Sequence, residues 1–263
     1  MEIARLLRTR RALVLAALFT FLGCTAPLLE HYAADILASA TSDEVRVELP
    51  PPTPADGIAS YESNAQQLGL IGVVVVASSA LCFHARPQAF VFYRMRVARR
   101  RDMVVPRYVV VVGACVAAYL LGLFGAWYET TLLIGDPGVP RTLAHGGLMS
   151  LHLAFVVAGV AFIASFFRSV LASVGSSLGV YLVALPALSV VDFVELWSPQ
   201  ALADSAAPLV SGSDGLGHYV VPAAVSAGLT VLLLAVSIQR VQTSARSRDR
   251  SAGSIPEWLG WPG

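Results

Sequence analysis

Two histidines seven residues apart are the groups in this sequence best placed to do chemistry together. His145 and His152 fall in one apolar stretch, and seven residues are close to two helical turns, so both rings share one helix face. Imidazole nitrogens ligate haem iron and other metals. A haem needs partner histidines at similar depth, and His31, His84 and His218 lie at the ends of apolar stretches. We therefore interpret the pair as polar packing between helices, assign no metal site, and keep a haem or metal-binding membrane protein as an alternative.

The second candidate is a pair of carboxylates, Asp192 and Glu195, near the outer end of a later apolar stretch. They are a candidate cation or proton site, although hydrated carboxylates at a membrane boundary are the simpler interpretation. Elsewhere the apolar stretches hold almost no ionisable residue, and such residues mark ion and proton pathways inside membranes. The sequence therefore disfavours a proton-driven pump.

Enzyme motifs give no further candidate. The sequence has no GxxxxGK[ST] phosphate loop, no HExxH and no CxxC. Without the first, the chain cannot bind a nucleotide in the manner of P-loop proteins. We expect a protein that is not an enzyme.

Six apolar stretches define the fold class, because each is near the roughly 20 residues that cross a bilayer as a helix. They cover residues 11–29, 67–85, 108–132, 144–167, 172–194 and 218–239. The chain is 56% hydrophobic and 13% charged, with a mean hydropathy of +0.68, which excludes an ordinary soluble domain. Its net charge of +1 argues against nucleic-acid binding. We expect an all-α integral membrane protein with six transmembrane helices.

The arginines predict the orientation of these helices. All eighteen basic residues are Arg, and only Arg46 and Arg141 lie outside the two termini and the loops after the second and fourth stretches. Cytoplasmic loops are enriched in Lys and Arg, so both termini are predicted to be cytoplasmic. Residues 2–11 place apolar and basic side chains on opposite faces, as an amphipathic helix lying on the inner membrane surface does.

This topology divides the chain into two parts. Residues 1–241 form the six-span transmembrane domain, and residues 242–263 form a mobile cytoplasmic tail. Within the domain we expect a long external loop at 29–66 and a basic cytoplasmic loop at 86–107. The external loop at 195–217 is long enough for a short re-entrant or interfacial helix.

The basic loop contains a predicted short helix that begins at Pro87, because proline is favoured at helix starts. Aromatic and apolar side chains are interspersed with Arg in this segment. Such anchors bind a groove on a cytoplasmic partner, although anionic lipid head groups would attract the same surface. The predicted partner-binding residues are Pro87, Phe90, Phe92, Tyr93, Arg94, Met95 and Arg96.

Residues 52–69 and the basic loop carry a resemblance to a known family. Pro52-Thr53-Pro54-Ala55-Asp56-Gly57 is followed by Tyr61, Asn64 and Gln67-Leu68-Gly69. This series is similar to the P-x-P-T-x-x-D-A…Y-x-x-N…Q-L-G pattern of ABC-2 type transporter permeases. The family also has an amphipathic N-terminal helix and six spans. Its coupling helix, which contacts the ATPase, corresponds to residues 88–100 of this chain.

The resemblance implies a permease subunit of an ABC exporter in a prokaryotic plasma membrane. The chain would need no catalytic residue and no cofactor of its own, because ATP and Mg²⁺ would bind to separate cytoplasmic ABC ATPase subunits. A second permease copy or a related permease would complete the transport path. Because the spans lack deep polar groups, we expect an amphipathic or lipophilic substrate. A non-transporting membrane subunit of a larger complex remains a further alternative.

Overall fold

The computed structural model describes residues 10–40, 51–82, 101–167, 169–185, 187 and 198–252. All regular structure within these ranges is helical. The long helices are α2 (Arg11–Ala40), α6 (Arg101–Leu133), α7 (Val139–Ala164) and α13 (Val220–Ala252). The shorter elements are α3 (Pro54–Asn64), η1 (Ala65–Gly69), α4 (Leu70–Leu81), α8 (Val170–Gly179), η3 (Val180–Ala184), α11 (Gln200–Ala203), α12 (Ala206–Ser211) and η4 (Leu216–Tyr219).

Five helical segments are long and apolar enough to cross a membrane, which confirms the all-α, multi-span class at this level. They are Arg11–Ala33, Pro54–Leu81, Val104–Leu133, Val139–Ala164 and Leu216–Arg240. The fifth stretch predicted from the sequence, 172–194, is described only as the shorter apolar helix Val170–Ala184 with a few residues beyond it. Residues 188–197 lie outside the described ranges.

Large apolar side chains cover the outside of this bundle. Phe21 of α2, Phe124 of α6 and Val231 of α13 are each more than 60% exposed. Contiguous apolar surface is rare on soluble monomers, whereas the hydrocarbon of a bilayer solvates it. The exposed side chains therefore fit a bundle that faces lipid.

The loop predicted at 29–66 is mostly helix. Residues 29–40 continue α2, and residues 54–66 belong to α3 and η1, which run directly into α4. The cause is a capping box at Thr53, whose backbone N–H and hydroxyl donate to Asp56 Oδ2 at 2.8 and 2.6 Å, followed by a proline at the first helical position. The second membrane helix thus begins at Pro54 rather than at residue 67, and it includes polar residues that were assigned to the loop.

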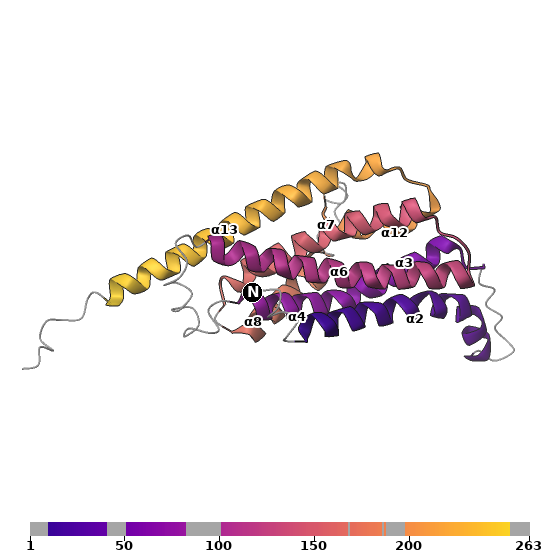
Figure 1. Cartoon of the computed structure of the whole chain (residues 1–263), viewed down its shortest axis with the longest axis horizontal. Helices are drawn as coiled ribbons and strands as arrows, with labels where there is room; N and C mark the ends of the chain where they lie inside the picture. Colours follow the sequence, from indigo (N-terminus) through magenta and orange to yellow (C-terminus); the bar gives the residue numbers. More distant parts are fainter. Residues whose placement is uncertain are drawn as a thin grey trace, which may run out of the picture.

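Helices α2 and α6 lie side by side along most of their length (Figure 1). Glycines allow this approach: a Cβ added to Gly23 would overlap the backbone carbonyl of Gly122, and one added to Gly125 would lie 3.4 Å from Cys24 Sγ. Small residues at a crossing let two membrane helices pack backbone against backbone. The α2–α6 pair therefore forms a close-packed wall of the bundle, with Phe19 and Tyr119 buried in it.

The two ends of the bundle carry different groups. At one end Arg11 Nη1 donates to Ser79 Oγ at 2.7 Å, and the Arg240 guanidinium lies 3.6 Å from the centroid of the Phe166 ring. The start of α2 and the ends of α4, α7 and the apolar part of α13 therefore meet there. At the opposite end Arg141 Nη1 donates to Val210 O of α12 at 3.2 Å.

Two short helices cover the end that holds Arg141. α11 and α12 lie within the segment 195–217, where the sequence allowed a short helix. α11 packs against α7, and α12 packs against α3 and α7. At the far end of α13, residues 242–252 of the predicted mobile tail continue the helix, whereas residues 253–263 lie outside the described ranges.

Candidate functional site

A buried carboxylate occupies the centre of the polar contacts. Glu62 of α3 is 2% exposed, and its Oε2 lies 2.7 Å from Tyr119 Oη and 3.0 Å from His145 Nε2. Tyr119 comes from α6 and His145 from α7, and both are fully buried. An ionisable group stays buried in a protein only where neighbours compensate for its lost hydration, and here a phenol and an imidazole do so.

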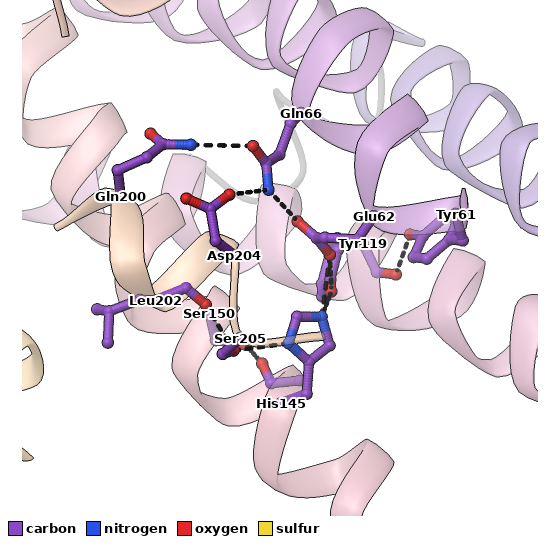
Figure 2. Close-up of polar contacts among 11 residues, drawn as sticks. Tyr61, Glu62, Gln66, Tyr119, His145, Ser150, Gln200, Leu202, Asp204 and Ser205 are labelled. Atoms are coloured by element: carbon purple, nitrogen blue, oxygen red, sulfur yellow. Dashed lines mark hydrogen bonds and ion pairs between the residues drawn. The ribbon is translucent and has the colours of Figure 1, made fainter. Parts of the chain in front are cut away.

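Both ring nitrogens of His145 have protein partners (Figure 2). Nε2 contacts Glu62 Oε2 at 3.0 Å and Tyr119 Oη at 3.0 Å, while Nδ1 lies 2.9 Å from Ser205 Oγ. Ser205 lies between α11 and α12, and its hydroxyl donates to Leu202 O at 2.7 Å. The imidazole thus joins the membrane helices to the two short helices that cover them.

A second tyrosine, Tyr61, holds Tyr119 in position. Tyr61, also of α3, donates its hydroxyl to the backbone carbonyl of Tyr119 at 2.9 Å, and the two rings lie 5.7 Å apart. Phe19 packs edge-on against the other side of Tyr119, with a centroid distance of 5.9 Å. These contacts set the depth and rotation of Tyr119, and therefore where its hydroxyl meets Glu62.

From Glu62 a chain of polar groups leads towards the surface (Figure 2). Gln66 Nε2 lies 3.5 Å from Glu62 Oε1 and 3.3 Å from Asp204 Oδ1, and Gln200 Nε2 donates to Gln66 Oε1 at 2.9 Å. Asp204 lies at the surface, between α11 and α12. Protein atoms still crowd its carboxyl, and this partial burial raises the pKa of Asp204 above its ordinary value, although hydrogen bonds from Gln66 and Gln200 act in the opposite direction.

Gln66 lies in a π-helical turn, the η1 segment Ala65–Gly69. Such turns insert one residue into an α-helix and rotate the residues that follow, and they occur often at functional sites. Here the turn separates α3, which carries Glu62, from α4, which is almost wholly apolar. The turn therefore marks the boundary between the polar and apolar parts of this membrane helix.

The cluster lies within the helical segments that are long and apolar enough to cross a membrane, towards the end that α11 and α12 cover. Glu62 is eight residues from the start of its segment at Pro54, and His145 is six residues from Val139, which places them about 12 and 9 Å along their helices. The predicted stretch 67–85 does not contain Glu62, so the prediction that the apolar stretches hold almost no ionisable residue did not cover it. The helical segment is longer, Pro54–Leu81, and includes this carboxyl group. The physical reason is that the Glu62 carboxyl group has hydrogen-bonding partners in Tyr119 and His145, so it can lie within a long helical segment although the residues around it have low hydropathy.

His145 and His152, the two histidines identified in the sequence, both contact the α11–α12 segment, but they do not belong to one site. His152 is also buried, and its Nδ1 lies 2.9 Å from Pro199 O at the start of α11. Within the described ranges no three His, Cys, Asp or Glu side chains come together as metal ligands would. Both rings therefore contact the α11–α12 segment.

Sequence reasoning missed Glu62, Gln66, Tyr119 and Ser205. The available signal was the Thr53–Asp56 spacing of a capping box followed by a proline, which predicts a helix through Glu62. The predicted carboxylate pair Asp192 and Glu195 lies outside the described ranges. So do the partner-binding residues Pro87, Phe90, Phe92, Tyr93, Arg94, Met95 and Arg96.

The chemistry open to this cluster is proton exchange rather than nucleophilic attack. Ser205, His145 and Glu62 are joined in the order of a hydrolase triad, but the Ser205 hydrogen points to Leu202 O and the hydroxyl is fully buried. A nucleophile must instead donate to its base and be reachable by substrate. Residues 175–179, Gly-Ser-Ser-Leu-Gly, also match the G-x-S-x-G pattern of a nucleophile elbow. They lie inside helix α8 and not on a strand-to-helix turn, so they do not form such an elbow.

Comparison of the chain with protein-family models, curated proteins and solved structures gives no significant match.

Proposed function

We propose that this chain is a permease, a membrane-spanning subunit through which a substrate crosses the bilayer. The observation that carries the proposal is the buried cluster of Glu62, Tyr119 and His145 within an apolar helical bundle. Ionisable residues inside a membrane are costly, and those that persist belong mostly to substrate, ion or proton paths. A buried ionisable pair contributes little net stability compared with apolar side chains of similar size, so stability alone does not account for this one.

The energy source we propose is a separate ABC ATPase, as the resemblance to ABC-2 permeases implies. ATP and Mg²⁺ would bind to that subunit, and residues 88–100 would transmit its closure to the spans. The residues that carry the resemblance are compatible with such a role, since Tyr61 holds Tyr119 in the cluster and Gly69 packs against Phe19. A second copy of this chain or a related permease would complete the path.

We propose six spans with both termini in the cytoplasm of a prokaryote. Arg11 and Arg240 meet at one end of the bundle, and Arg141 lies at the other. The positive-inside rule assigns the first end to the cytoplasm. Under this orientation Asp204 and the α11–α12 segment face the outside, and the Glu62 cluster is reached from there.

The substrate class follows from the cluster. The argument for a fully lipophilic substrate rested on spans without ionisable groups, and Glu62 removes that argument. An amphipathic substrate with a polar or cationic group remains, because such a group can replace the imidazole as the partner of the carboxylate while the apolar part faces the helices.

Affinity purification of the tagged full-length chain in mild detergent tests the proposal. We expect an ABC ATPase to co-purify in stoichiometric amount. We expect combined replacement of Phe90, Phe92 and Tyr93 by Ala to uncouple its ATP hydrolysis from the permease without unfolding the spans. Val109→Ala, on the exposed face of α6, is the control and should leave coupling intact. Recovery of other membrane subunits without an ATPase would contradict the ABC assignment and favour the non-transporting alternative.

An absorbance scan of the same eluate tests the haem alternative. A haem held by both histidines would need a ring nitrogen of His145, and both nitrogens of that ring already contact Glu62 or Ser205. We therefore expect no Soret band. A stoichiometric band would mean that the cluster opens to bind haem and would overturn the permease proposal.

A further inference from the structure

Three atoms of the Glu62 cluster lie so close together that their hydrogens can be counted. Glu62 Oε2, His145 Nε2 and Tyr119 Oη are separated by 2.7, 3.0 and 3.0 Å. The Tyr119 hydroxyl has one hydrogen, and its shortest contact is with the carboxylate, so it donates there. The contact between Oε2 and Nε2 then needs a hydrogen of its own, because two bare acceptors repel each other at 3.0 Å.

The other side of the imidazole decides which nitrogen is already protonated. Ser205 also has a single hydrogen, and its Oγ lies 2.7 Å from Leu202 O, a carbonyl that can only accept. Ser205 therefore accepts from Nδ1–H of His145 at 2.9 Å. A neutral imidazole carries only one N–H, so Nε2 is bare unless one more proton lies between it and Glu62.

We propose that Glu62 and His145 form a proton-binding site, in which one exchangeable proton is shared between Oε2 and Nε2. With this proton the pair is neutral overall, as carboxylic acid and imidazole or as carboxylate and imidazolium. Its loss to water leaves a carboxylate facing the lone pair of Nε2 and a net charge of −1. The inference builds on the proposed transport role, because a permease that binds and releases this proton can link proton movement to its cycle.

A proton is the ligand that fits the closed site. The donor and acceptor atoms already touch one another, so there is no place between them for a metal ion or a substrate group in this conformation. The titratable groups that face the pair come from four parts of the fold. They are Tyr61 beside Glu62 on α3, Tyr119 on α6, His152 on α7 and Asp204 between α11 and α12.

Proton release would act on the α11–α12 segment. Without the shared proton, Oε2 and Nε2 repel each other, and the cheapest relief is a movement of α3 away from α7 or a rotation of the His145 ring. Rotation of the ring breaks the Nδ1–H bond to Ser205, which ties the short helices to the bundle. Gln66 and Asp204 lie between Glu62 and the surface at this same end, so the proton leaves on the side that α11 and α12 cover.

Nuclear magnetic resonance of the full-length chain tests the site directly. The chain is labelled with ¹⁵N in its histidine rings, held in mild detergent, and titrated between about pH 4 and pH 9, a range that spans the ordinary carboxyl and imidazole pKa values. His145 is assigned by its loss in His145→Gln. We expect Nδ1 of His145 to stay protonated throughout and the shared proton to be lost in one step. That step appears as loss of the Nε2–H signal where the imidazole holds the proton, or as loss of an infrared band of a protonated carboxyl group where Glu62 holds it.

Glu62→Gln and the matched control Glu129→Gln, on α6 outside the cluster, complete the test. We expect Glu62→Gln to remove this titration step and to lower the protons released per chain by about one, whereas Glu129→Gln leaves the His145 signals unchanged. If Glu62→Gln does not fold, the wild-type titration alone decides. A His145 ring with Nε2–H and a bare Nδ1 at every pH, or a pair that never loses its proton, overturns the proposal.

This outcome is separable from that of the proposed function. The titration reads proton binding without any partner or substrate. A chain that binds the proton but purifies without an ATPase refutes the ABC assignment alone, and a chain that purifies with its ATPase but shows no shared proton refutes the proton site alone.

Discussion

Replacing Gly122 by Ala should separate α2 from α6 and disturb the polar cluster at a distance. An added Cβ would lie 2.5 Å from Tyr61 Oη and 2.8 Å from the backbone carbon of Phe19, and it would overlap the Phe19 carbonyl oxygen. Ordinary contacts begin near 3.4 Å, so the neighbours must move by about 1 Å. Forcing one methyl group into a packed interior costs about 1–3 kcal/mol, and we expect a loss of that size in the free energy of unfolding.

The movement also has a specific target. The Tyr61 hydroxyl donates to Tyr119 O at 2.9 Å, and a shift of about 1 Å takes this contact beyond hydrogen-bonding distance. Tyr119 then loses the bond that fixes its depth, and its contact with Glu62 should weaken. We expect Gly122→Ala to change the ring signals of His145 as well as the stability of the bundle.

Unfolding in detergent with increasing denaturant, followed by circular dichroism, measures the loss. Gly113→Ala is the control on the same helix, since a Cβ added there meets nothing within 4 Å. Its stability should equal or slightly exceed that of the wild type, because alanine favours helix over glycine. If Gly122→Ala is as stable as Gly113→Ala, the close packing of α2 and α6 does not limit stability and our reasoning is refuted.

Three further predictions concern other contacts. Glu62→Ala leaves His145 and Tyr119 without their partner and should lower the free energy of unfolding by about 3–5 kcal/mol. The control Glu129→Ala, at a partly exposed position, should lower it by less than about 0.5 kcal/mol. Equal losses would contradict a buried pair. A Cβ at Gly159 would overlap Tyr181 Oη, so Gly159→Ala should lower the free energy of unfolding. Adding Tyr181→Phe to this variant should recover most of that loss. Strictly additive effects of the two substitutions in the double variant would contradict the overlap. The raised pKa of Asp204 stabilises the folded chain at pH values below the ordinary carboxyl pKa, and this contribution is lost as pH rises through the raised value. Stability should therefore fall over that interval in the wild type and not in Asp204→Asn, whereas parallel pH profiles would show that the carboxyl has an ordinary pKa.

Much of the architecture could be predicted from local sequence. The apolar stretches at 11–29, 108–132, 144–167 and 218–239 all coincide with helices long enough to span a membrane. This works because lipid requires every backbone polar group to be paired within the segment, so length and hydropathy suffice to recognise a span. The prediction failed at 54–66, where hydropathy is low and helix formation depends instead on the Thr53–Asp56 cap and on burial of Glu62.

The site was predictable only in part. His145 was recognised because histidine is rare within an apolar stretch, but its partner was assigned to an external loop. Glu62, Tyr119, His145 and Ser205 come from α3, α6, α7 and the junction of α11 and α12. No spacing in the sequence relates these positions. Each belongs to a different segment, so a helical period, which relates residues of one helix only, does not connect them.

The sequence by itself determined that this chain is an all-helical membrane protein, and it determined which of its loops carry the positive charge. The hydropathy of a segment and the charge of a loop depend only on the residues within that segment or loop, so they can be read without knowing how the helices pack. The tertiary structure decided that Glu62 lies inside the bundle and which atoms surround it. That outcome depends on the depth and rotation of α3, α6 and α7 relative to one another, set by Gly23 against Gly122 and by Tyr61 against Tyr119. A carboxylate is tolerated at such a depth only when phenol and imidazole groups from other helices arrive at hydrogen-bonding distance, and only packing brings them there.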